Sequence, residues 1–191
     1  MVFRRFLGGG GSRDPGWTVT PAPAAPAGQE TETVRRIIGQ LDALPLERAR
    51  YLAAFAYILT RAAAADFDIS QAEMEVIEGL VAEHGGLAEA QAVLVAEMAR
   101  HQSLLDAATE DYLVTRQFRD LSTPEERLAL LRCCYLVGAA DDTITVAESD
   151  TLQEIAKELD VDRAAVNAIR HEFEPRLAAI QALLRLQGRP G

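Results

Sequence analysis

The chain has 191 residues and a formal net charge of −10, with 49 % hydrophobic but only 6 % aromatic residues. This length fits one ordinary domain with a tail, and the scattered Lys and Arg residues argue against nucleic acid as a partner, because phosphate binding needs clustered positive charge. Alanine and leucine, both strong helix formers, carry most of the apolar content. We therefore expect an all-α protein.

Residues 1–30 are expected to form a disordered tail, since residues 8–29 are rich in Gly, Pro and Ala. The short basic and apolar tip at residues 3–7 is expected to make at most a weak peripheral contact with a membrane. No secretory signal peptide is recognisable, and Arg61 interrupts the longest apolar run, which is shorter than the roughly 20 residues of a spanning helix. We expect a cytoplasmic protein, with membrane association through its partners as a further option.

Helical periodicity, capping residues, Pro and Gly predict the helices in residues 31–191. The predicted helices cover 31–44, 46–65, 71–85, 88–107, 109–121, 124 onward, 146–159 and 162 onward. Pro175 should kink or split the last of these. The prediction is one compact bundle of about seven to eight helices.

A shift of 75 residues aligns AADFDISQAEMEVIEGL, residues 64–80, with AADDTITVAESDTLQEI, residues 139–155. Each copy lies between an apolar helix and an amphipathic one, so we expect a duplicated helix–loop–helix unit. No Lys or Arg lies between Arg61 and Arg100, where there are eight acidic residues, and none lies between Arg132 and Lys157, where there are five. Exposed helices usually mix charges of both signs, so these windows predict acidic surfaces with a function.

Two interpretations of the repeated pattern stay open. Serine or threonine followed three residues later by glutamate is a capping box, which explains those residues without a ligand. The aspartate four residues before each cap is not explained in this way, because the end of the preceding helix is already negative. Oxygen ligands suit Ca²⁺, Mg²⁺ or Mn²⁺. The candidate metal ligands are Asp66, Asp68, Ser70, Glu73, Asp141, Thr145 and Glu148.

The loops are not EF-hands, because Gln71 stands at the position of the loop glycine and Ile77 at that of the bidentate glutamate. The doubled pattern A-D-x-x-I-[S/T]-x-x-E instead resembles the tellurite-resistance TerB-like family, which includes the N-terminal domain of the co-chaperone DjlA, over roughly residues 31–175. Where the family pattern has glycine, this chain has Phe67 and Asp142. It also lacks the His-Pro-Asp triplet of a J-domain.

The resemblance implies a compact helical domain with acidic sites suspected of metal binding, used for sensing or interaction in tellurite or general stress response. No nucleophile or zinc motif is recognisable around the three histidines, and the adjacent Cys133 and Cys134 are expected to be small buried residues, with a redox pair as the alternative. We therefore expect no enzyme and no small-molecule substrate. The leading expectation is a cation-binding module. The main alternative is a structural adaptor whose acidic face docks a basic protein partner, and a metal-dependent hydrolase is a third and more remote hypothesis.

Overall fold

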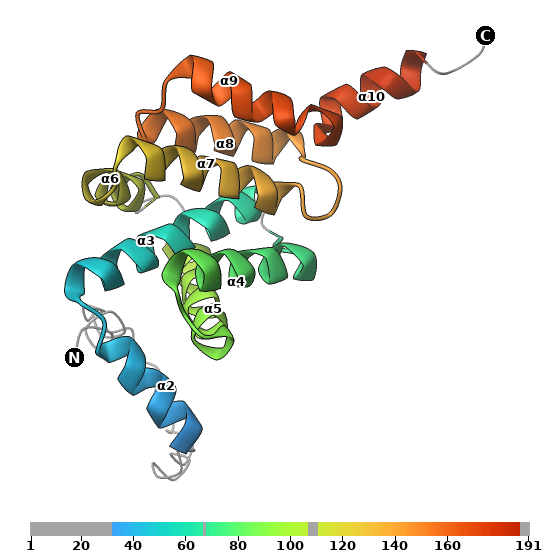
Figure 1. Cartoon of the computed structure of the whole chain (residues 1–191). Coiled ribbons are helices and arrows are strands. Elements are labelled where there is room, and N and C mark those ends of the chain that lie inside the picture. Colours follow the sequence, from blue (N-terminus) through green and yellow to red (C-terminus); the bar gives the residue numbers. More distant parts are fainter. Residues whose placement is uncertain (1–31, 67, 107–110, 188–191) are drawn as a thin grey trace, which may run out of the picture. The chain divides into compact units, whose positions relative to one another are not determined.

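The computed structural model describes residues 32–66, 68–106 and 111–187 (Figure 1). Within these ranges it contains nine α-helices and two short 3-10 helices, and no strand. The all-α prediction is therefore confirmed. The number of helices exceeds the expected seven to eight because the last predicted stretch divides at Pro175, as that residue suggested. The predicted tail, linker and membrane-contacting tip lie outside the described residues.

The chain divides after Leu46 into two units, and the second unit carries both acidic repeats. The first unit contributes α2 (Glu32–Asp42). The elements that follow are α3 (Leu46–Ala63), η1 (Ala64–Asp66), α4 (Gln71–Gly85), α5 (Glu89–Asp106), α6 (Asp111–Leu121), α7 (Pro124–Gly138), α8 (Val146–Glu158), α9 (Arg163–Glu172), η2 (Glu174–Arg176) and α10 (Ala178–Gln187).

Local signals explain where the helices begin and end. The helices α4, α7 and α8 each start with a capping box, at Ser70, Thr123 and Thr145. Pro124 occupies the first turn of α7, where its missing N–H costs nothing. Gly86 ends α4 in the left-handed region, with φ of 61°, a conformation that glycine adopts without strain.

In the second unit, each repeat is a pair of helices joined by an acidic loop: α3 and α4 in the first, α7 and α8 in the second. The helix α4 packs against α5 and α7, α8 packs against α6 and α7, and η1 contacts α8, so the two repeats meet (Figure 1). Fully buried Ile77, Leu152 and Ile155 from α4 and α8 belong to the core beneath the loops. None of the helices in the described ranges is both long and apolar enough to cross a membrane.

Candidate functional site

The two repeats start their second helices with the same hydrogen bonds. Ser70 Oγ accepts the Glu73 amide at 3.2 Å, and Glu73 Oε2 accepts the Ser70 amide at 2.7 Å. Thr145 and Glu148 form the same two bonds at 3.2 and 2.7 Å. The cap residues also share an extended backbone, with φ/ψ of −66°/159° and −65°/168°. The capping boxes predicted from the sequence are confirmed, so four of the candidate ligands already stabilise their own helices.

Glu73 and Glu148 are brought together although 75 residues separate them in sequence. Their side chains are 6 % and 4 % exposed and are hydrogen bonded to each other. Burial raises the pKa of both carboxyls although the hydrogen bonds of the caps lower it, and the pKa of Glu148 rises to about 7. A hydrogen bond between two carboxyl groups requires a proton on one of them, so the contact is made by one neutral and one charged glutamate or by two neutral ones.

The surroundings of the pair add to the cost of a second negative charge. A Cβ atom placed on Gly138 would lie 3.5 Å from Glu148 Oε1, so this oxygen lies beside the C-terminal end of α7. That end of a helix carries partial negative charge. Asp141, in the loop of the second repeat, raises the pKa of Glu73 in the first through its own charge. Acidic groups from both repeats therefore act on one another.

The loop aspartates are placed differently from the glutamates. Asp141 is exposed, and its Oδ1 accepts the Thr143 amide at 3.2 Å. This side-chain-to-backbone turn gives the Asp141 carboxylate a local role outside the capping box. Asp68 is exposed as well. The side chain of Asp66 lies outside the described residues.

Asp142 stands at the position of the family's glycine. Its φ is 73°, in the left-handed region, which aspartate tolerates better than most residues. Its carboxylate forms an ion pair with Arg176. The second loop therefore makes the turn that glycine would favour, without glycine; its counterpart Phe67 is outside the described residues.

The candidate ligands whose side chains the structure describes do not form a complete metal site. Within the described ranges, no three or more His, Cys, Asp and Glu side chains are grouped so that they could hold a metal ion. The Glu73–Glu148 pair supplies two carboxyl groups, and a cation would need at least one more oxygen ligand, for which Asp66 and Asp141 are the candidates. The chemistry of the pair does fit a hard cation, because two carboxyl groups in contact require a proton or a cation between them.

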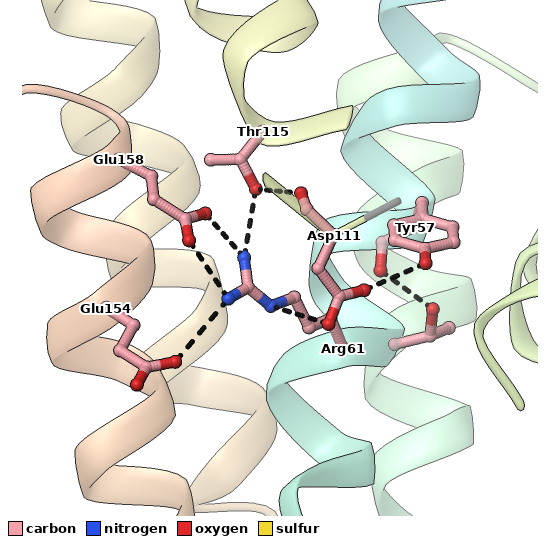
Figure 2. A network of polar contacts seen from close by, with 7 residues as sticks. Tyr57, Arg61, Asp111, Thr115, Glu154 and Glu158 are labelled. Carbon is pink, nitrogen blue, oxygen red and sulfur yellow. Dashed lines mark hydrogen bonds and ion pairs between the residues drawn. The ribbon is translucent and has the colours of Figure 1, made fainter. Parts of the chain in front are cut away.

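A network of ion pairs and hydrogen bonds around buried Arg61 joins helices of both repeats, and the sequence did not predict it (Figure 2). Arg61 of α3 is 9 % exposed; its Nη1 donates to Glu158 Oε2 at 2.6 Å and to Thr115 Oγ1 at 3.1 Å, and its Nε lies 3.3 Å from Asp111 Oδ2. Tyr57 donates to the other Asp111 oxygen at 2.8 Å. The network joins α3, α6 and α8, and so fixes the helix that enters the first loop against the helix that leaves the second.

Burial alone would lower the pKa of Arg61, but the hydrogen bond and charge of Glu158 raise it, so the guanidinium stays charged in the core. The sequence contains one signal for this role: a single arginine inside an otherwise apolar helix needs buried partners. In the sequence, Arg61 stands out as an interruption of an apolar run and as the start of an acidic window.

The cysteines are buried and free, as expected for small core residues. Cys133 Sγ lies 3.5 Å from His84 Nε2, but burial raises the pKa of this thiol to about 11. The reactive thiolate form is therefore disfavoured at neutral pH. The contact serves packing between α4 and α7 and does not form an activated nucleophile.

Comparison with known families gives a match. The family model described as tellurite resistance protein TerB matches residues 51–171, a span that covers more than half of the chain and includes both acidic repeats. No curated protein and no solved structure shows a significant match. The duplicated helix–loop–helix units, their paired capping boxes and the family match lead to the same assignment: this chain belongs to the TerB family.

Proposed function

We propose that this TerB domain is a non-enzymatic interaction module that binds a divalent cation, Ca²⁺ or the related Mg²⁺ or Mn²⁺, where its two repeats meet. One observation carries the proposal: Glu73 and Glu148, one from each repeat, are buried in hydrogen-bonding contact. Two adjacent carboxylates repel each other strongly. A divalent cation relieves that repulsion when the shared proton leaves.

The residues that would hold the cation are the two glutamates and the loop aspartates Asp66 and Asp141. The hydroxyls of Ser70 and Thr145 are occupied by the capping boxes, and they would act by fixing the glutamates. Asp68 lies exposed in the first loop, where its charge adds to the local negative field. Binding would release a proton from the pair, so affinity should rise with pH.

Calorimetric titration of the whole chain with Ca²⁺ tests the proposal, with Mg²⁺ as the competing ion. Glu73→Gln should abolish a saturable heat, whereas Glu126→Gln should leave it intact. Glu126 is a matched control because it forms the same capping box, with Thr123, at the start of α7. The absence of heat at millimolar Ca²⁺, or an unchanged heat in Glu73→Gln, would refute cation binding at the pair.

A second candidate function is a structural adaptor whose acidic surface docks a basic protein partner without metal. The Asp142–Arg176 ion pair favours this function, because it shows that an acidic loop of this fold can bind an arginine side chain. Docking by charge weakens steeply as ionic strength rises, whereas Ca²⁺ binding should be selective over Mg²⁺. The dependence on salt and on the choice of ion therefore separates the two candidates.

The family name also suggests the process. We place the module in tellurite or general stress response, acting in the cytoplasm through a protein partner, without nucleic acid or a small-molecule substrate. If a deletion strain is sensitive to tellurite, and the native gene restores resistance while a Glu73→Gln gene does not, this placement would be supported. Equal growth of deletion and parent strains on tellurite would contradict it.

A further inference from the structure

The helix α10 turns a polar side chain towards the domain and leaves apolar side chains exposed. Gln181 faces the second loop: its Nε2 donates to the Asp142 carbonyl at 3.0 Å, and its Oε1 accepts the Thr143 hydroxyl at 3.3 Å. Three large apolar residues within the next turn are 50, 58 and 69 % exposed: Leu183, Leu184 and Leu186. An amphipathic helix normally buries its apolar side, so these leucines indicate a contact with another molecule.

The segment that carries these leucines is also basic. Residues 175–191 contain three arginines and no Asp or Glu, in a chain whose net charge is −10. One of the three, Arg185, is exposed and lies between two of the leucines in the sequence. A surface that covers α10 must therefore offer apolar contact beside negative charge. An anionic membrane offers both, but it repels the acidic remainder of this chain.

The outer face of α4 offers the same combination on a protein surface. Glu75 and Glu83 are exposed, and Val76 and Leu80 are partly exposed. Their spacing puts these four residues on one side of the helix, and we call them the acidic face of α4. Residues 62–99 contain no Lys or Arg that could neutralise this face along the chain.

The exposed leucines and the acidic face of α4 are available for a contact between two copies of the chain. Within one copy, α10 packs against η2, whereas α4 packs against α5 and α7 (Figure 1). The helix α10 has ten residues, and one helix of this length is too small for the roughly 1,200–2,000 Å² that specific interfaces bury. In a two-fold symmetric pair, each copy gives its α10 and receives that of its partner, so the contact is made twice. Pairing of α10 with α10 would instead be made once and would bring like charges together.

We propose that α10 docks on the acidic face of α4 in a second copy of this chain. The leucines contact Val76 and Leu80, and Arg185 lies beside the glutamates of that face. This is a helix laid on an apolar surface that charged residues surround. The inference rests on the adaptor function described above and makes a second copy the basic partner. It does not depend on cation binding at Glu73 and Glu148.

Sedimentation velocity of the full-length chain in EDTA tests the proposed dimer. We expect a monomer–dimer equilibrium with a dissociation constant on the order of 100 µM at low salt, which high salt weakens. The double change Leu183→Ser and Leu186→Ser should leave a monomer. Leu113→Ser is the control, because it alters a leucine of α6 that is 56 % exposed, and it should leave the equilibrium unchanged. None of these side chains belongs to the core.

Charge-reversal variants test the receiving face. The double change Glu75→Lys and Glu83→Lys should abolish the dimer, because it reverses the charge that Arg185 meets. The double change Asp120→Lys and Asp150→Lys alters the net charge equally at exposed positions of α6 and α8. This control should not weaken the dimer, since a smaller net charge reduces the general repulsion between copies.

A mixture of variants distinguishes the proposed contact from pairing of α10 with α10. The isotope-labelled leucine double variant keeps the acidic face of α4, and the unlabelled glutamate double variant keeps α10. When the second is added to the first, NMR should show amide shifts centred on residues 72–83. Pairing of α10 with α10 predicts no shifts in this mixture.

Three outcomes would overturn the inference: a native chain that stays monomeric up to about 500 µM, an equal loss of dimer in Leu113→Ser, or dimers that persist in the glutamate double variant. A monomeric native chain would leave the adaptor function standing, with another basic protein as its partner. The salt dependence of docking to such a protein tests that function separately.

Discussion

Replacing Glu148 with glutamine removes one ionisable proton from the carboxyl pair and changes little else. The glutamine amide can donate to Glu73 as a protonated carboxyl would, and its oxygen can accept the Thr145 amide, which lies 2.7 Å from Glu148 Oε2 in the native protein. The substitution therefore keeps the shape and the hydrogen bonds of the pair. The substitution does remove the possibility that both side chains of the pair become negatively charged.

The size of the effect follows from the pKa of Glu148, which burial raises from an ordinary 4.5 to about 7. A carboxyl whose pKa is higher in the folded than in the unfolded chain binds its proton more tightly when folded. Its contribution to stability is complete below pH 4.5 and is lost as the pH rises through about 7. At about 1.4 kcal/mol per pH unit, the loss approaches about 3 kcal/mol by pH 8.

Urea unfolding followed by circular dichroism, at several pH values from 4.5 to 8 and in EDTA, measures this loss. The native protein should lose stability towards pH 8, and Glu148→Gln should show a much flatter profile. The variant should therefore exceed the native protein by about 2–3 kcal/mol at pH 8. Glu126→Gln, which alters an equivalent capping box outside the pair, should show the native pH dependence with a small constant offset.

A Glu148→Gln profile as steep as that of the native protein would refute the reasoning, because the pH dependence would then come from other groups. Equal flattening by Glu126→Gln would refute it as well, since the effect would belong to capping and not to the pair. Repeating the native series with Ca²⁺ links this result to the proposed function. A bound cation should restore stability at pH 8 in the native protein and not in Glu148→Gln.

Arg61→Ala should lower the free energy of unfolding in urea by about 3–5 kcal/mol, because it leaves the partly buried carboxylates of Asp111 and Glu158 unpaired. Arg132→Ala breaks an exposed pair and should cost less than about 1 kcal/mol; an equally small loss for Arg61→Ala would contradict this. Gly86→Ala should lower the stability by about 1 kcal/mol, because φ is 61° there. Gly79→Ala, in open space within α4, should raise the stability by about 0.5–1 kcal/mol. Thermal melts in which Gly86→Ala is the more stable variant would contradict the role of Gly86 as the C-cap. At pH 8, Cys133 should react with a thiol reagent about 100-fold more slowly in native than in unfolded protein, and equal rates would show that the thiol is not buried.

The helices could be predicted well because their boundaries are set locally. Ser70, Thr123 and Thr145 each cap the helix that the sequence assigned to them, and Gly86 ends α4. The main difference is at the first loop, where the helix expected to reach residue 65 ends at Ala63 and continues as a 3-10 turn. Such fraying depends on the tertiary contacts of the last turn and not on residue preference.

The site was predictable in its parts but not in its assembly. The sequence assigned Glu73 and Glu148 to two capping boxes, and it left open whether the repeats form two separate sites or share one surface. The contact between the two glutamates depends on how the repeats pack against each other, which involves residues 75 positions apart. Burial within that contact, and not the local motif, raises their pKa values.

A parallel β-bridge joins Ile144, in the loop of the second repeat, to Leu177, and it was missed for a different reason. It is an isolated bridge of one residue on each side, so neither partner belongs to an alternating run that predicts a strand. The Asp142–Arg176 ion pair was equally invisible, because the two residues lie in different predicted segments and no local spacing relates them. Single long-range contacts of this kind have no periodic signature.

The duplication gives the two loops the same caps and leaves them with different partners. Glu73 and Glu148 meet where the two repeats pack, so both repeats set the charge of the pair. Ile144 of the second repeat is buried and bridged to Leu177, whereas Ile69 of the first repeat is partly exposed. Because Glu73 also accepts the Ser70 amide, ionisation of the pair acts directly on the start of α4.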